Sequence, residues 1–155
     1  MGARALRCLG VEPGGPDRAA PFDLAVLAHH ERRVRRAVLT LVHGDRVALD
    51  LGEARTLVHG DRLLLEDGRE AEIIAGDEEL IEIVARDAEH LGEIAWHLGN
   101  RHAPAQVEAT RILVARDAVI AHMLEGLGAR LRDVEEPFEP VRGAYHAHDH
   151  AGHTP

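Results

Sequence analysis

Hydrophobic and polar positions alternate over short runs between residues 20 and 76. The runs FDLAVLAHH, RRAVLTLVHGDRVALDL and TLVHGDRLLLEDGREAEIIAGD predict short strands with one buried face. Turn residues separate them, with His-Gly-Asp at 43–45 and 59–61 and Asp-Gly at 67–68. The hexapeptide LVHGDR occurs twice, at 41–46 and 57–62, which we interpret as two similar turns. Residues 1–76 are therefore predicted to form a small all-β domain, sandwich-like or barrel-like.

The periodicity changes after residue 77. ELIEIVA (79–85) predicts a strand, and residues 87–102 predict a helix with Asp87 as its N-cap. In that helix Leu91, Ile94, Ala95 and Leu98 share one apolar face. AQVEA and RILVA are typical of strands, residues 117–128 of a second amphipathic helix, and ARLRDVEEPF of a last strand. The order β-α-β-β-α-β predicts a ferredoxin-like domain over 77–142.

The last residues, 143–155, have no apolar periodicity and are predicted to be a disordered, histidine-rich tail. The predicted fold class is thus α+β: a β domain, a ferredoxin-like domain and a flexible tail.

Composition and charge narrow the function classes. The net charge of −9 disfavours binding to nucleic acid and to anionic membranes. Cys8 is the single cysteine, so a disulfide framework or a cysteine-rich zinc site within one chain is excluded. We see no secretory signal and no apolar run of about 20 residues, which predicts a cytoplasmic protein.

Twelve histidines are the unusual feature, and four of them lie in the last ten residues. His146, His148 and His150 form H-x-H-x-H around Asp149, and His153 follows. Alternate side chains of an extended chain project to one side, so these imidazoles can reach one ion. Imidazole with carboxylate suits Ni(II), Cu(II) and Zn(II). A low-complexity tail without a role is the alternative.

The other histidines leave more than one interpretation open. His102 extends the stripe through Leu91 and Leu98, which indicates either a core or helix-capping histidine or a position at a two-fold interface, where two copies would share one ion. His97 lies on another face of the helix, and we interpret His97 and His90 as solvated. His43 and His59 are interpreted as exposed turn residues in preference to a surface metal pair. No H-E-x-x-H, P-loop or G-x-S-x-G motif is present, so we expect no enzyme activity.

The segment WHLGNRHAPAQ, beginning at residue 96, closely resembles the hallmark of the UreE urease accessory proteins, which are nickel metallochaperones. GDRLLLEDGREAEIIAGDEELIEI resembles the domain junction of that family, and MLEGLGARLRDVEEPFEPVRGAY resembles its last helix and strand. The similarity runs from about residue 34 to the end.

The resemblance implies a homodimer that delivers Ni(II) to urease, with a GTPase-containing assembly complex and the urease apoprotein as partners. It implies that His102 is the interfacial ligand and that His146, His148, His150 and His153 assist, with His97 less certain. Family members often carry histidines around the aspartate that starts the second helix. Here Arg116 and Ala118 flank Asp117, so a second site at Asp117 and His122 is a weaker expectation.

Three rivals remain at this point. A buffer or sensor would sequester Zn(II) or Cu(II), which can compete with nickel, without any link to urease. An interaction module would bind peptides through the β domain, independently of metal. A metal hydrolase would need a rigid site with an open coordination position.

Overall fold

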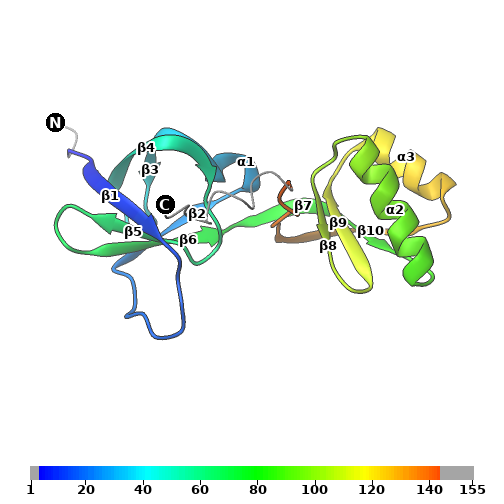
Figure 1. Ribbon diagram of the computed structural model, residues 1–155, viewed down its shortest axis with the longest axis horizontal. Coiled ribbons are helices and arrows are strands. Elements are labelled where there is room, and N and C mark those ends of the chain that lie inside the picture. Colours follow the sequence, from blue (N-terminus) through cyan, green and yellow to red (C-terminus); the bar gives the residue numbers. More distant parts are fainter. Residues whose placement is uncertain (1–3, 144–155) are drawn as a thin grey trace, which may run out of the picture. The chain divides into compact units, whose positions relative to one another are not determined.

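The computed structural model describes residues 4–143 and divides the chain into two compact units, Met1–Asp77 and Glu78–Pro155 (Figure 1). The elements of the first unit are β1 (Leu6–Glu12), β2 (Asp23–Leu27), α1 (His29–Arg32), β3 (Arg33–Thr40), β4 (Arg46–Thr56), β5 (Arg62–Leu65) and β6 (Glu70–Ala75). Those that follow are β7 (Asp77–Val84), α2 (Ala88–Asn100), β8 (Ala105–Val107), β9 (Arg111–Ala115), α3 (Ala118–Gly126) and β10 (Arg130–Pro137).

The first unit is one curled sheet with the strand order β2-β6-β5-β1-β4-β3. Its two edge strands approach each other where the Val42 amide, just after β3, donates to the Leu24 carbonyl of β2 at 2.9 Å. The curl encloses an apolar core that includes Val47, Leu57 and Leu63, each with no exposed surface. The predicted all-β domain is therefore confirmed, in the form of a single curled sheet.

Strand β1 was not predicted from the sequence. It lies in the middle of the sheet, antiparallel to β5 and parallel to β4. Its burial pattern is irregular, and its register shifts between Cys8 and Gly10, so the period-two alternation that marks a strand is broken. β3 and β4 are also longer than expected, at 8 and 11 residues.

The two LVHGDR turns differ in what they connect. The first joins the antiparallel hairpin β3–β4, while the second joins β4 to β5, which are not neighbours in the sheet. Both turns place glycine at positive φ, 101° at Gly44 and 91° at Gly60, which explains the shared His-Gly-Asp sequence. The repeat is a repeated turn and not a repeated fold unit.

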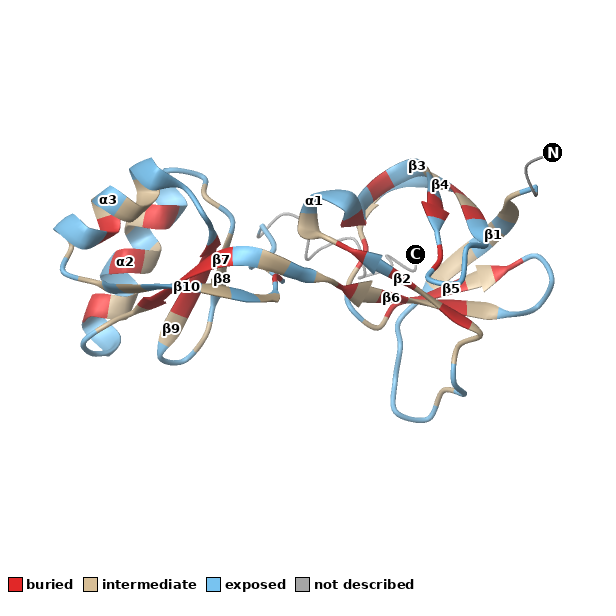
Figure 2. Cartoon of the chain, turned by 180° about the vertical axis from the view of Figure 1, so that it is seen from behind, coloured by how far each residue is buried: buried red, intermediate tan, exposed pale blue. Residues whose placement is uncertain are grey.

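The second unit has the predicted β-α-β-β-α-β order, with the sheet order β10-β7-β9-β8. Both helices lie on one face of this sheet (Figure 1). Ile94 and Leu98 of α2 and Leu124 of α3 are fully buried against Ile83 and Ile112 of the sheet. These burials confirm the predicted apolar face of the first helix, and Figure 2 shows buried segments on α2, on α3 and on the strands of this sheet.

The helix-free face of the sheet has its own small core. Leu80, Leu113 and Phe138 are buried there, with Val134 packed against them. Beside this cluster Arg111 contacts Glu82 at 2.7 Å and both carboxylate oxygens of Glu136 at 2.8 and 2.9 Å. These bonds lower the pKa of Glu136 and raise that of Arg111.

No helix in residues 4–143 is long and apolar enough to cross a membrane.

Candidate metal centre

Helix α2 ends two residues earlier than the sequence predicted. Its last helical residue is Asn100, and the chain then turns so that the His102 amide donates to Gly99 at 3.0 Å and the Ala103 amide to Leu98 at 3.2 Å. This pair of bonds is the Schellman motif, with His102 at the first position beyond the cap. Ala103 packs on the cluster that contains Leu98, which supplies the apolar contact usual in this motif. His102 therefore leaves the helix and does not continue the buried stripe.

The backbone of His102 is in the left-handed region, with φ of 52°. Within residues 4–143 it is the one residue other than glycine with positive φ. A side chain in this conformation costs about 1 kcal/mol relative to glycine, although histidine tolerates it better than most residues. The imidazole is exposed, and no part of the described chain gives it a hydrogen bond or ion pair. A strained backbone thus presents an available ligand, which is typical of a functional position.

His97 lies one turn before the helix end and is half-buried. Its ring contacts the indole of Trp96 edge-on, with centroids 5.0 Å apart and planes at 86°. Trp96 itself is 65% exposed. The aromatic contact holds the His97 ring against the exposed indole on the surface of α2.

His90, which we interpreted as solvated, is buried, with 2% of its surface exposed. Its Nδ1 accepts from the Arg86 amide at 3.0 Å, so the ring proton is on Nε2, which donates to the Leu127 carbonyl at 2.7 Å. The prediction was wrong because both partners are backbone groups, and Leu127 is 37 residues away. His90 joins the start of α2 to the end of α3 and has no nitrogen left for a metal.

Asp117 is the N-cap of α3, as Asp87 is of α2. Its Oδ1 accepts from the amides of Val119 at 2.8 Å and Ile120 at 2.9 Å, and these bonds explain its presence without a metal. His122 is exposed on the same helix. Residues 4–143 contain no group of three histidine, cysteine or acidic side chains arranged to hold an ion. A second site at Asp117 and His122 stays a prediction.

The tail histidines His146, His148, His150 and His153 lie outside the described residues, as does Asp149. Near the end of the described chain, the Val141 amide donates to the Ala105 carbonyl at 2.8 Å. Ala105 is three residues beyond His102.

The two turn histidines of the first unit have separate partners. The His43 ring lies 2.8 Å from the buried carboxylate of Asp23, and His59 accepts from the Ala75 amide at 3.1 Å. Burial acts to raise the pKa of Asp23, but hydrogen bonds from the His43 ring and from the Leu24 and His43 amides outweigh burial, so the net pKa is lowered. The sequence offered no signal for this pair, whose members are 20 residues apart.

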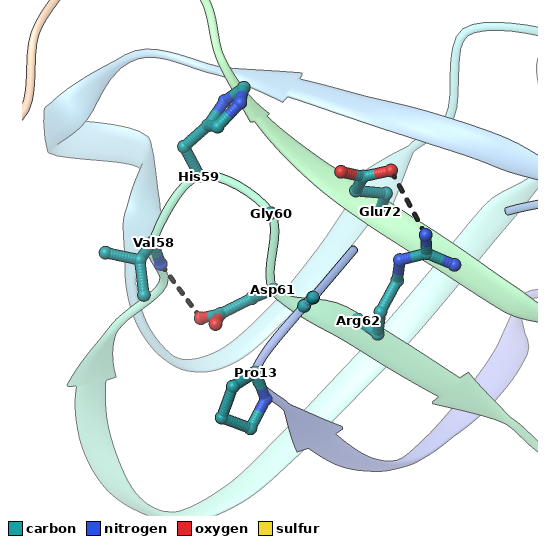
Figure 3. A pocket seen from close by; sticks show the side chains of 9 residues that line it. Pro13, Val58, His59, Gly60, Asp61, Arg62 and Glu72 are labelled. Atoms are coloured by element: carbon teal, nitrogen blue, oxygen red, sulfur yellow. Dashed lines mark hydrogen bonds and ion pairs between the residues drawn. The ribbon is translucent and has the colours of Figure 1, made fainter. Parts of the chain in front are cut away.

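His59 lies beside a cavity of about 530 Å³ in the first unit (Figure 3). The polar side chains of its wall are largely engaged with the protein: Asp61 accepts from the Val58 amide at 2.9 Å, and Arg62 pairs with Glu72 at 3.5 Å. Asp61 and Arg62 are buried, so we interpret the polar side chains of this wall as structural and not as metal ligands. The candidate metal centre is therefore the turn at His102.

Comparisons with known proteins show which family the chain belongs to. The N-terminal domain model of the UreE urease accessory proteins matches residues 7–76, and the C-terminal domain model matches residues 78–155. The first match extends further toward the N-terminus than the resemblance noted from sequence motifs, because it includes most of β1. Together the two models define the class: a urease accessory protein.

Similar proteins include the urease accessory protein UreE of Agrobacterium fabrum, 53% identical over 149 residues, which cover 96% of this chain and 91% of that protein. That of Rhizobium meliloti is 52% identical over 139 residues, 90% of either chain. That of Mesorhizobium japonicum is 54% identical over 140 residues, 90% of this chain and 71% of that protein. The chain belongs to the UreE family.

Proposed function

We propose that this protein is a nickel metallochaperone, without catalytic activity, that carries Ni(II) to urease during its maturation. One ion is held between two protomers by the His102 imidazole of each. The observation that carries the proposal is the exposed His102 side chain on a left-handed backbone, at a position where glycine is the favoured residue. A histidine there costs stability, and the ligand that it supplies would account for its presence at this position.

A second copy of the chain is the partner that the surface of α2 favours. Trp96 is exposed, and it lies one helical turn from Gly92 and from Gly99, at spacings of four and three residues. An added Cβ at either glycine would meet open space, so packing within the chain does not require them. Glycine within a helix costs about 1 kcal/mol, and an exposed indole beside small residues suits close packing against another molecule. A two-fold axis near this line would bring two His102 turns together.

The tail histidines His146, His148, His150 and His153 supply further ligands in this proposal. His146 lies five positions after Val141, a span of at most about 18 Å, and Ala105 lies three positions after His102, a span of at most about 11 Å. The first tail histidine is thus within covalent reach of His102 in its own protomer. Imidazole ligands suit Ni(II), and Cu(II) and Zn(II) will compete for the same nitrogen atoms.

Delivery requires a recipient. We propose that the recipients are the urease accessory GTPase and the urease apoprotein, and that the transfer takes place in the cytoplasm. Membership of the urease accessory family supports this part of the proposal. Because copper outcompetes nickel at most nitrogen sites, affinity alone does not separate a nickel carrier from a metal buffer. Transfer of nickel to urease does separate them, since a buffer would keep its metal when the assembly complex is added.

The test is nickel titration calorimetry on the intact protein, on His102→Ala and on a chain truncated after Tyr145, with oligomer mass measured in parallel. We expect His102→Ala to remove the tightest event, at about one ion per dimer, while truncation weakens binding or removes later events. The proposal fails if His102→Ala binds nickel as the intact protein does and truncation alone removes all binding.

A further inference from the structure

The outer face of the sheet in the first unit gathers arginine side chains over three neighbouring strands, β1, β4 and β3 (Figure 1). Val47 and Leu49 of β4 and Leu39 of β3 are buried in the core, so the residues that alternate with them point away from it. We name the outward residues the arginine face: Arg7 of β1, Arg46, Ala48 and Asp50 of β4, and Arg36 and Val38 of β3. All of them except the half-buried Ala48 are exposed.

The strand register places two of these arginines next to an apolar centre. Arg7 lies opposite Ala48, which lies opposite Val38, so the three form one row across the strands. Arg46 precedes Ala48 by two residues and is therefore the diagonal neighbour of Arg7, with about 7–8 Å between their Cα atoms. Val38 is 50% exposed, and Leu9 of β1, 64% exposed, lies two residues beyond Arg7. Two cations thus flank a small exposed apolar surface.

The charges of Arg7 and Arg46 are not balanced within the protein. Neither guanidinium makes an ion pair with any residue between 4 and 143, and Asp50, the carboxylate of this face, is bound by Arg36 at 3.1 Å. In a chain with a net charge of −9, acidic residues that could pair with these arginines are abundant. Two neighbouring cations repel each other, so their placement without a counter-charge is not explained by the stability of the first unit.

We infer that the arginine face is a docking surface for another protein that presents an acidic, extended segment. In an extended chain, side chains two residues apart point to the same side and lie about 6.6–6.8 Å from each other. Two carboxylates at this spacing match the separation of Arg7 and Arg46, and each guanidinium can bind a carboxylate through two parallel N–H bonds. An apolar residue two positions further along the segment contacts the surface at Val38.

A nucleic acid is the alternative partner for a surface rich in arginine, and this face disfavours it. Binding to a phosphate backbone depends on many cations, whereas here Asp50 lies within the face and the chain as a whole is acidic. Arginine beside exposed valine and leucine is instead typical of contacts between proteins, which combine an apolar centre with charged groups around it. The face contains none of the proposed nickel ligands, so the inference does not depend on the proposed function.

The test is a titration of the intact, isotope-labelled protein with the synthetic peptide Glu-Ser-Glu-Ser-Leu at low ionic strength, followed by the NMR shifts of the backbone amides. The control peptide Gln-Ser-Gln-Ser-Leu has the same length and no side-chain carboxylate. We expect the acidic peptide to shift the amides of Arg7, Ala48 and Val38, and the control peptide to leave them unchanged. Salt at about 0.5 M should remove the binding, because exposed ion pairs are screened.

Arg46→Glu and Arg130→Glu are matched variants. Each reverses the charge of an exposed arginine at the first position of a strand, β4 in the first unit and β10 in the second. We expect Arg46→Glu to weaken peptide binding about fivefold and Arg130→Glu to change it less than about twofold. Arg46→Lys keeps the charge without the planar fork and should weaken binding about two- to threefold. Arg7→Glu repeats the test from the neighbouring strand, and the amide spectrum of each variant shows that it is folded.

Three results would overturn the inference. The first is the absence of shifts at the arginine face with the acidic peptide, or equal binding of the two peptides. The second is an equal loss of binding in Arg46→Glu and Arg130→Glu, because the attraction would then not be local to this face. The third uses a single-stranded oligothymidylate of ten nucleotides: if it binds more tightly than the acidic peptide and shifts the same amides, the face binds nucleic acid.

Discussion

Helices α2 and α3 end in the same way but with different residues. In α3 the Gly128 amide donates to Glu125 and the Ala129 amide to Leu124, which repeats the Schellman bonds of α2 atom for atom. The position beyond the cap is Gly128, with φ of 77°, in one helix and His102, with φ of 52°, in the other. Glycine adopts this conformation without steric cost and histidine does not. At the end of α2, therefore, a histidine occupies a position where the backbone conformation favours glycine.

Position 102 therefore has two requirements, one from the backbone and one from the proposed metal site. The fold requires a left-handed residue at position 102, and the proposed metal site requires an imidazole there. At position 128 only the first demand exists, and glycine meets it. Substitutions that exchange or remove these residues therefore distinguish stability from function.

His102→Gly has the largest expected effect and acts in two directions. It removes both imidazoles of the proposed shared site, so we expect nickel affinity at the tightest site to fall at least about a hundredfold, equivalent to about 3 kcal/mol. The same change relieves the left-handed side chain, so the free energy of unfolding should rise by about 0.5–1 kcal/mol. Calorimetry with nickel and urea unfolding of the metal-free protein measure the two effects.

The matched control is His102→Asn, because asparagine tolerates the left-handed region but lacks an imidazole. It should lose nickel as the glycine variant does, with little change in metal-free stability. If His102→Gly lowers the stability of the metal-free protein, the histidine side chain has a structural role and the comparison between the two helix ends fails.

His90→Leu should have the next largest effect, on stability alone. Leucine fills similar space but leaves the Arg86 amide and the Leu127 carbonyl without their partner in a buried position. We expect a loss of about 2–4 kcal/mol in the free energy of unfolding, and unchanged nickel binding by the protein that remains folded. His90, in the first turn of α2, would then have a role in stability, and His102, beyond the end of α2, a role in nickel binding. A nickel defect in fully folded His90→Leu protein would contradict this division.

Gly128→His gives the end of α3 the residue that α2 has at the same position, a histidine in the left-handed region. An added Cβ at Gly128 would have its nearest neighbour, an Arg86 guanidinium nitrogen, at 3.9 Å, so the cost is that of the backbone and not of a clash. We expect the free energy of unfolding to fall by about 1 kcal/mol, with no new nickel site. Thermal unfolding compares this variant with Gly128→Asn, which should lose less.

These pairs also show what a sequence can reveal. Apolar periodicity predicts the α+β class and the buried face of α2, because Ile94 and Leu98 occupy positions set by the helix repeat alone. The exposure and backbone of His102 depend on where the helix ends, and its end is set by hydrogen bonds to Gly99 and Leu98 that have no sequence period. The roles of His90 and Phe138 come from contacts across the sheet and between helices, so no local pattern predicts them.

Asp117→Ala has an expected effect as small as that of Gly128→His, and it tests whether α3 contributes to metal binding. If Asp117 is only an N-cap, the substitution leaves the Val119 and Ile120 amides without their acceptor and lowers the free energy of unfolding by about 1 kcal/mol. Asp117→Asn should restore most of that stability, since asparagine caps equally well, and neither variant should change nickel affinity. A nickel loss shared by Asp117→Asn and His122→Ala, with stability retained, would instead show a second site at the start of α3. The two helices would then both carry metal ligands, and the difference between their ends would no longer mark the division between structure and function.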